Sequence, residues 1–180
     1  METTAKTKWI IDPAHSEVQF KVKHLVISTV TGSFAKFEGS LLASKDDFSD
    51  ATIEFSADAD SISTNQADRD AHLKSPDFFD AANHPKLTFK SSSFRINDGT
   101  EYELVGDLTI KGTTKQVKLS VEYGGTTKDP WGNTKSGFEI SGKINRKDFG
   151  LSWSAVTEAG GLVVADEVKL ALNIELARQN

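Results

Sequence analysis

The 180-residue sequence contains no cysteine, only four prolines and a single methionine. Without cysteine, the chain can form no disulfide framework, thiolate zinc site, iron–sulfur cluster or cysteine nucleophile. An excess of basic residues is missing too, because 21 Lys and Arg stand against 26 Asp and Glu, a formal net charge of −5. Nucleic-acid binding and a polybasic membrane patch both need clustered Lys and Arg. We therefore expect neither.

Long apolar runs are also absent from the sequence. No segment approaches the roughly 18 consecutive apolar residues of a membrane span. Residues 1–8 are polar and lead directly to Trp9, without the apolar core of a signal peptide. We expect a cytoplasmic protein, or a periplasmic one if a leader was removed. The length predicts a single domain over residues 1–180, since one core can bury roughly 70% of the surface of such a chain.

Alternation of apolar and polar residues is the dominant pattern. It places apolar side chains on one face of a sheet and polar ones on the other, as antiparallel sheets with one wet face require. Turn signals such as Asn97-Asp98-Gly99 separate the segments. Eight or more such strands predict an all-β fold, either a closed antiparallel barrel or a sandwich. The clearest alternating segments are 18–24, 53–59, 117–123 and 168–176.

Breaks in this alternation favour the barrel. Phe89 and Phe94 lie on opposite parities with serines 91–93 between them, and Phe34 and Phe37 also differ in parity. A one-residue slip turns every later side chain to the other face, so we expect a β-bulge at each place. Bulges bend strands, and long bent strands are typical of barrels. Alternatively, each strand changes sides where it passes an end of the sheet.

Residues 63–82 interrupt the β pattern with helix formers and capping residues. Thr64 or Asn65 can cap a short helix that ends near Lys74. Ser75 followed by Pro76 predicts a second helix start, because proline is favoured at the first helical position. We expect a short helical insertion in the all-β fold.

The sequence holds little that indicates catalysis. Four histidines are its only bases at neutral pH, and no pair has the spacing of a HExxH-type zinc motif. No Gly-x-Ser-x-Gly elbow and no glycine-rich phosphate loop is present. We expect His15 to be a hydrogen-bonded turn residue, and His24 to continue the inward row of its strand. No catalytic residue, metal site or cofactor is predicted.

The apolar residues point to the barrel interior instead. Phenylalanines occupy the expected inward face of at least four strands, and Phe78 and Phe79 belong to the helical insertion. An eight-stranded barrel either fills its interior with side chains or holds one small apolar ligand. Small inward residues such as Ala57, Gly106 and Gly142 would leave room for a ligand, or would merely fit the taper of the barrel. Both interpretations stay open at this point.

Six stretches, in this order and spacing, resemble the YceI-like family of lipid-binding proteins over nearly the whole chain. They are WIIDPAHSEVQFKVKHL (9–25), GSFAKFEG (32–39), SIST (61–64), RDAHLKSPDFFD (69–80), GDLTIKG (106–112) and RKDFGL (146–151). The resemblance implies an extended, lipocalin-like antiparallel β-barrel with the helical insertion near one end. It also implies a long hydrophobic pore that takes a polyisoprenoid, such as a quinone tail, or another long aliphatic lipid.

On this basis we expect a protein that binds and sequesters or carries such a lipid, its one expected ligand. Arg69 and His72 in the matched insertion, and His24 at the end of its inward row, are candidate contacts for a head group, although capping and ion pairing are the simpler roles for the first two. The candidates for the pore lining are Phe20, Val22, Phe37, Phe55, Leu73, Phe78, Phe79, Phe89, Leu108, Phe138 and Trp153.

Two other functions remain open. One is an enzyme that modifies an isoprenoid or quinone through His15, His24 or His72. The other is a stress-linked interaction module, whose filled barrel presents loops such as 128–132 with Trp131. Edge strands and hydrophobic pore mouths also make a homodimer possible.

Overall fold

Eleven strands form one antiparallel sheet in the computed structural model, which describes residues 5–154 and 163–179. One α-helix, α1 (Ala67–Lys74), and the short 3-10 helices η1 (Pro13–His15), η2 (Ala59–Ser61) and η3 (Arg146–Phe149) connect them. Within these ranges no helix combines the length and apolar character needed to cross a membrane. The strands are β1 (Thr7–Ile11), β2 (Glu17–His24), β3 (Ser28–Phe34), β4 (Phe37–Ala43), β5 (Thr52–Asp58), β6 (Ile62–Ser63), β7 (Lys86–Asp98), β8 (Glu101–Ile110), β9 (Thr113–Lys128), β10 (Thr134–Asn145) and β11 (Val164–Arg178).

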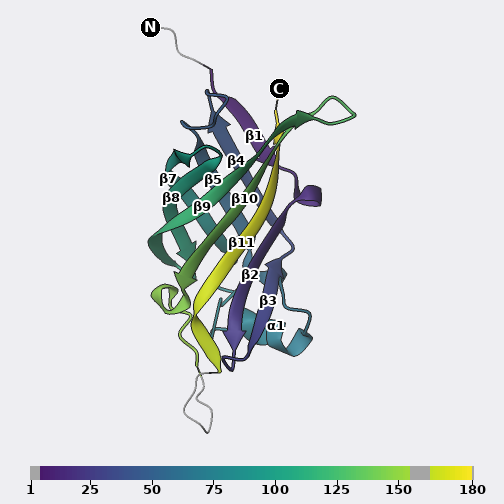
Figure 1. Cartoon of the computed structure of the whole chain (residues 1–180). Helices are drawn as coiled ribbons and strands as arrows, with labels where there is room; N and C mark the ends of the chain where they lie inside the picture. Colours follow the sequence, from purple (N-terminus) through teal and green to yellow (C-terminus); the bar gives the residue numbers. More distant parts are fainter. Residues whose placement is uncertain (1–4, 155–162, 180) are drawn as a thin grey trace.

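Eight of the strands close into a barrel. They pair in the order β1-β4-β5-β7-β8-β9-β10-β11, and β11 pairs back with β1. The prediction of an antiparallel barrel is thus confirmed against the sandwich. Figure 1 shows the long, tilted strands, with the start of β1 and the end of β11 at the same end of the barrel, which we name the upper end.

Strand β11 is long enough to pair with two strands placed one after the other. Its final residues pair with β1, as in Leu176 opposite Ile11, and its earlier residues pair with β2, as in Val168 opposite Val22. The helix η1 separates β1 from β2. Strands β3 and β6 extend the sheet beyond β2, and α1 lies beside them at the opposite, lower end (Figure 1).

The two predicted bulges have different outcomes. The register of β7 against β8 shifts between Ser91 and Ser93, which confirms the first. The second is wrong, because β3 ends at Phe34 and β4 begins at Phe37. The chain leaves one partner strand for another at this point, since β3 pairs with β2 whereas β4 pairs with β1 and β5. A strand break therefore accounts for the change of parity.

The helical insertion is confirmed only in part. Helix α1 ends at Lys74 as predicted, but its N-cap is Gln66, whose side chain accepts a hydrogen bond from the Arg69 N–H at 2.5 Å. The predicted second helix after Ser75 is wrong, because residues 76–79 and 81–83 form turns. The N–H of Phe79 donates to the carbonyl of Leu73 at 3.0 Å, which bends the chain back toward the barrel. Burial of this segment outweighs the local helix-start signal.

Candidate functional site

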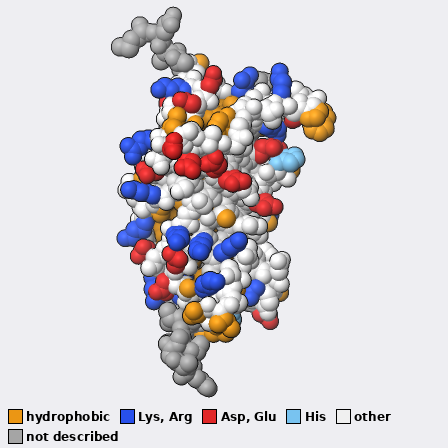
Figure 2. Space-filling model, viewed as in Figure 1, with side chains coloured by type: hydrophobic (Ala, Val, Ile, Leu, Met, Phe, Trp, Pro, Cys, Tyr) orange, Lys and Arg blue, Asp and Glu red, His pale blue; other side chains and the backbone are white. Residues whose placement is uncertain are grey.

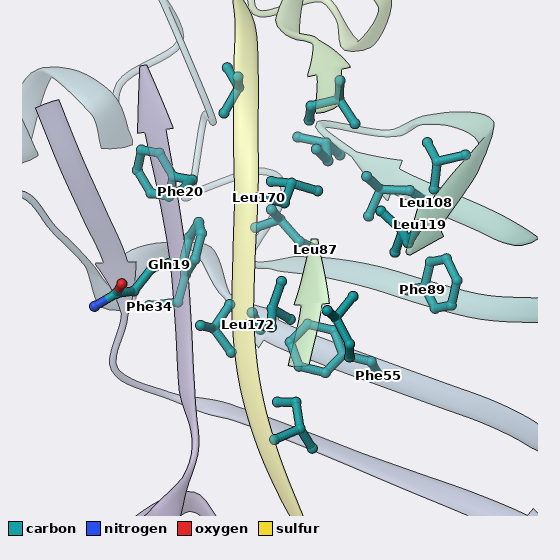
Figure 3. Close-up of a pocket in the computed structure, with 18 of the residues that line it drawn as sticks. Gln19, Phe20, Phe34, Phe55, Leu87, Phe89, Leu108, Leu119, Leu170 and Leu172 are labelled. Carbon is teal, nitrogen blue, oxygen red and sulfur yellow. The ribbon is translucent and has the colours of Figure 1, made fainter. Parts of the chain in front are cut away.

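The interior of the barrel contains a cavity of about 220 Å³. Aliphatic and aromatic side chains from the strands and from the helical insertion make up most of its wall (Figure 3). Of the few polar residues along it, Glu54 directs its carboxylate outward toward Lys90 and is 68% exposed. Apolar cavities of roughly 150 Å³ stay dry and take up benzene-sized molecules. This larger cavity is therefore suited to an apolar ligand.

Strand β11 illustrates how alternation builds the wall. Every second residue from Val168 to Leu176 lines the cavity, whereas the residues between them lie on the outer face of the sheet. Figure 3 shows Leu170 and Leu172 among the side chains around the cavity. The period of two in the sequence thus becomes a continuous apolar stripe on one strand.

The bulge in β7 keeps this strand on the cavity wall over its whole length. Leu87 and Phe89 line the cavity before the bulge, and Phe94 lines it after the bulge. Without the extra residue, Phe94 would face outward. Strands β8 and β9 supply Leu108 and Leu119 to the same region (Figure 3).

The small inward glycines leave no empty space of their own. A Cβ at Gly106 would lie 2.5 Å from the ring of Phe89 and 2.5 Å from the carbonyl oxygen of Lys90. A Cβ at Gly142 would likewise collide with the side chain of Leu119. These glycines accommodate large neighbours, so at these positions the packing interpretation is correct. Ala57, the third of these small inward residues, does line the cavity.

An aromatic cap closes the upper end of the barrel. Phe48, which is 2% exposed, packs edge-on against Trp9, Tyr123 and Phe138, with ring centroids 5.3, 5.7 and 5.5 Å away. Phe138 also lines the cavity. The cap therefore forms the upper limit of the apolar space.

The loop that carries Phe48 is fixed by hydrogen bonds. The Asp50 carboxylate accepts the N–H groups of Ser44 and Lys45 at 3.0 and 3.1 Å, together with the Ser44 hydroxyl. These bonds lower the pKa of Asp50 to about 2. The hydroxyl of Tyr102 donates to the carbonyl of Asp47 at 2.6 Å, and burial raises the pKa of Tyr102. The cap is thus held from both sides.

The helical insertion forms the lower part of the cavity wall. Leu73 on α1 and the following Phe78 and Phe79 all line the cavity. Phe79 packs edge-on against Phe34 of β3, with ring centroids 5.9 Å apart. Trp153 covers Phe78 from the other side at 5.5 Å. The insertion therefore packs into the barrel and does not merely connect two strands.

Among the described residues, Arg146 is the one charged residue whose side chain is buried at the cavity, at 4% exposure. Its guanidinium donates to four backbone carbonyls and lies 3.6 Å from the Asp166 carboxylate. Burial lowers the pKa of Arg146. These bonds hold the chain before and at the start of β11 against the barrel. The acceptors are the carbonyl oxygens of Leu151 (2.5 Å), Trp153 (2.7 Å), Ala165 (2.9 Å) and Val164 (3.3 Å).

Most of the predicted lining residues lie on the cavity wall. Phe37 and Trp153 do not: Phe37 stacks on Phe55 at 6.4 Å, and Trp153 packs outside Phe78. Contact of the others with a ligand stays a prediction. The candidates on the wall are Phe20, Val22, Phe55, Leu73, Phe78, Phe79, Phe89, Leu108 and Phe138.

The three candidate head-group contacts lie away from the wall. Arg69 donates to the hydroxyl and the carbonyl of Thr64, both at 2.7 Å, and thereby ties α1 to the residue that follows β6. His72 lies 2.8 Å from the Asp77 carboxylate on the outer side of the insertion. His24 is half-buried at the lower rim, opposite Val164 of β11. The three side chains do not converge on one site.

A charged cluster joins β1, β10 and β11 on the outside of the barrel. The Asp12 carboxylate contacts His15 and Lys135, each at 2.9 Å, and Glu175 lies 3.5 Å from His15. Lys135 and His15 hold the pKa of Asp12 well below its usual range, and Asp12 raises the pKa of His15. His15 is thus the hydrogen-bonded turn residue that was predicted. Lys135 already occupies the position that a cation would take between these carboxylates. The cluster is therefore a set of ion pairs that links the strands.

Several important residues were not among the predicted lining. Leu170 and Leu172 carried the clearest signal, the unbroken alternation of β11. Phe94 could have been predicted as a lining residue from the expected bulge, because the extra residue turns it to the same face as Phe89. Phe48 and Arg146 had no usable signal, since one lies in a polar loop and the other begins a charged turn.

Solved structures share this barrel. BcnA of Burkholderia cenocepacia superposes with a TM-score of 0.80 at 24% identity, covering 92% of this chain and 98% of its own. The Campylobacter jejuni YCEI protein gives 0.74 at 32% identity, covering 89% and 91%. A polyisoprenoid binding domain from Saccharophagus degradans gives 0.69 at 14% identity, covering 95% and 98%.

Sequence relatives point the same way. A UPF0312 protein of Staphylococcus epidermidis is 37% identical over 97% of this chain and 99% of its own length. Another, from Pectobacterium carotovorum, is 35% identical over 97% and 88%. The sequence profile of the YceI-like domain matches residues 9–176. With nearly its whole length matched by that profile, the chain belongs to the YceI-like family.

Proposed function

We propose that the barrel binds a long apolar chain, a polyisoprenoid such as a quinone tail or a similar aliphatic lipid, and sequesters or carries it. The observation that carries this proposal is the internal cavity of about 220 Å³ with its hydrocarbon wall. An isoprenoid tail has no hydrogen-bonding groups, so apolar burial and shape must supply its recognition. The wall offers both.

The free energy of burying the apolar tail favours tight retention of the lipid, with little selectivity for its head group. Each buried CH₂ contributes about 0.8 kcal/mol, so about 15 enclosed carbons give about 12 kcal/mol before association costs. The aromatic cap at Phe48 sets the upper limit of the enclosed length. Because the guanidinium of Arg146 donates its hydrogen bonds to backbone carbonyls, it is not a dedicated partner for a charged head group.

The likeness to a solved domain described as polyisoprenoid-binding supports a ligand of this class. At 14% identity that likeness extends to the fold alone, so the proposal rests on this chain's own cavity wall. Carriage is also favoured over the two alternatives. A filled barrel is inconsistent with the cavity, and none of His15, His24 and His72 is among the residues of its wall.

A chain-length series tests the proposal. Delipidated protein is titrated with isoprenoid alcohols of increasing length, and with the matching quinones, while tryptophan fluorescence or calorimetry reports the affinity. Affinity should rise steeply with each isoprene unit and level off once the cavity is full, with little difference between the two head groups. Affinity that is independent of chain length but dependent on the head group would refute enclosure of the tail.

A further inference from the structure

A cluster of exposed apolar side chains lies at the lower end of the barrel. The turn between β2 and β3 consists of Leu25, Val26 and Ile27, which are 38%, 74% and 85% exposed; we name it the tip. Figure 2 shows hydrophobic side chains at this end of the molecule. Burying three adjacent branched side chains against a partner would be strongly favourable, so the tip is a candidate contact surface.

The backbone of the tip makes its apolar composition costly. Leu25 and Val26 have φ angles of 54° and 67°, in the left-handed region that branched side chains rarely adopt. Hairpin turns with two positive φ angles strongly favour Asn-Gly, which relieves this strain. A Leu-Val pair here lowers stability relative to that alternative. Strain of this kind persists only where packing or function maintains it, and the exposed side chains of Val26 and Ile27 contribute little packing.

The tip is held beside the lower end of the cavity. The N–H of Leu25 donates to the carbonyl of Val163 at 3.0 Å, and the hydroxyl of Ser28 donates to the carbonyl of His24 at 3.3 Å. Val164, the next residue along, and Val22 both line the cavity. A surface that covers the tip would therefore lie next to the lower cavity wall.

Lysines from three adjacent strands lie on the outer face above the tip. Lys143 of β10 is in register with Lys169 of β11, which is in register with Lys21 of β2, and Lys23 follows two residues closer to the tip. All four are exposed; we name them the lysine band. Figure 2 shows the basic side chains on this face. Lys143 pairs with Glu167 at 3.9 Å, and no ion pair within residues 5–154 and 163–179 involves Lys21, Lys23 or Lys169.

We propose that the tip inserts into the headgroup region of an anionic lipid bilayer while the lysine band faces its phosphates. This docking rests on the proposed function, since it places the lower end of the lipid-holding cavity at the membrane from which a lipid would enter or leave. Charge indicates which partner covers the tip. The chain as a whole carries a net charge of −5, so an anionic surface repels it everywhere except at the lysine band. No basic patch is visible in the sequence, because the register between strands brings these lysines together.

Flotation of the purified full-length chain with lipid vesicles tests the docking. One set of vesicles is pure phosphatidylcholine, and in the other about a third of the lipid is phosphatidylglycerol. We expect binding to the anionic set that weakens with salt. Each band lysine near the surface should contribute about fivefold to the binding constant, so Lys21→Gln/Lys23→Gln/Lys169→Gln should lose about a hundredfold at low salt. Lys8→Gln/Lys45→Gln/Lys128→Gln removes the same number of charges at the upper end; it is the matched control and should bind like wild type.

The tip variant Leu25→Asn/Val26→Gly/Ile27→Thr gives the sharper test. Relief of the positive-φ strain should leave the chain at least as resistant to urea as wild type, whereas vesicle binding should fall by roughly tenfold or more. Loss of folding stability in this variant would mean that the tip serves packing, and would overturn the proposal. Trp131, 82% exposed in the loop at the upper end, supplies the opposing control. If Trp131→Ser abolishes binding and the tip variant retains it, the opposite end docks and the proposal is wrong.

Failure of docking and failure of lipid binding are separable. Lipid loading in solution is measured on the same samples by titration without vesicles. If the protein loads lipid in solution but does not bind anionic vesicles, the docking proposal is refuted and the proposed function is not. A tip variant that changes the oligomeric state in gel filtration, with no vesicle binding by wild type, would assign the tip to a second copy of the chain and likewise overturn the proposal.

Discussion

Filling part of the cavity with a larger side chain should stabilise the empty barrel and strongly weaken lipid binding. An unfilled apolar cavity costs about 24 cal/mol per Å³, so a volume of about 220 Å³ corresponds to about 5 kcal/mol. Leu172 is half-buried on the cavity wall (Figure 3), and Leu172→Trp places an indole in part of that space. We expect the free energy of unfolding of the delipidated protein to rise by about 0.5–2 kcal/mol.

Urea unfolding, with and without a saturating isoprenoid alcohol, measures both effects. Wild type should gain stability from the lipid, and Leu172→Trp should gain little. The matched control is Asn173→Trp, because the neighbouring residue is exposed on the outer face of the same strand. It should respond to the lipid as wild type does. If Leu172→Trp destabilises the empty protein by overpacking and leaves the response to lipid unchanged, the assigned binding space is wrong.

Other predictions concern packing and charge. Gly106→Ala should cost about 1–3 kcal/mol in urea unfolding because its Cβ meets a ring and a carbonyl, whereas Gly137→Ala, with open space around it, should change stability by less than about 0.5 kcal/mol. Arg146→Met should cost about 3 kcal/mol or more, since it removes the donors of four backbone carbonyls and leaves the Asp166 carboxylate with Lys147 as its ion-pair partner, and Arg146→Lys should not restore the loss. Asp12 raises the pKa of His15, so protonated His15 stabilises the fold fully below pH 6.5, and this contribution is lost as the pH rises through the raised pKa. Melting temperatures of His15→Gln should accordingly fall below wild type in acid and converge with it at alkaline pH.

Alternation predicted the parts of the site that repeat. The stripe of β11 and the inward phenylalanines of β2, β5 and β7 follow from a period of two, because each strand has one wet and one dry face. The serines at 91–93 marked the bulge that keeps Phe94 on the wall. Closure into a barrel was favoured by these bends and by the family resemblance, and the pairing of β1 with β11 establishes it.

Contacts between segments that are distant along the chain could not be predicted from the sequence. Phe48 reaches the cap from a polar loop, and its partners come from β1, β9 and β10. For Gly106 the sequence left open whether it leaves space or fits the taper, and the ring of Phe89 from the neighbouring strand occupies that space. The predicted second helix failed because burial of Phe78 outweighed a local capping signal. Register across strands decides such features, and alternation within one strand contains no information about it.

Native mass spectrometry of the freshly purified protein tests the central claim most directly. Gentle ionisation should show the chain carrying a long-chain lipid, and organic extraction should release the same species for identification. Leu172→Trp, purified in parallel, should carry much less. A protein that carries no lipid when purified, and that cannot be loaded with any long-chain isoprenoid in trace detergent, would contradict the account.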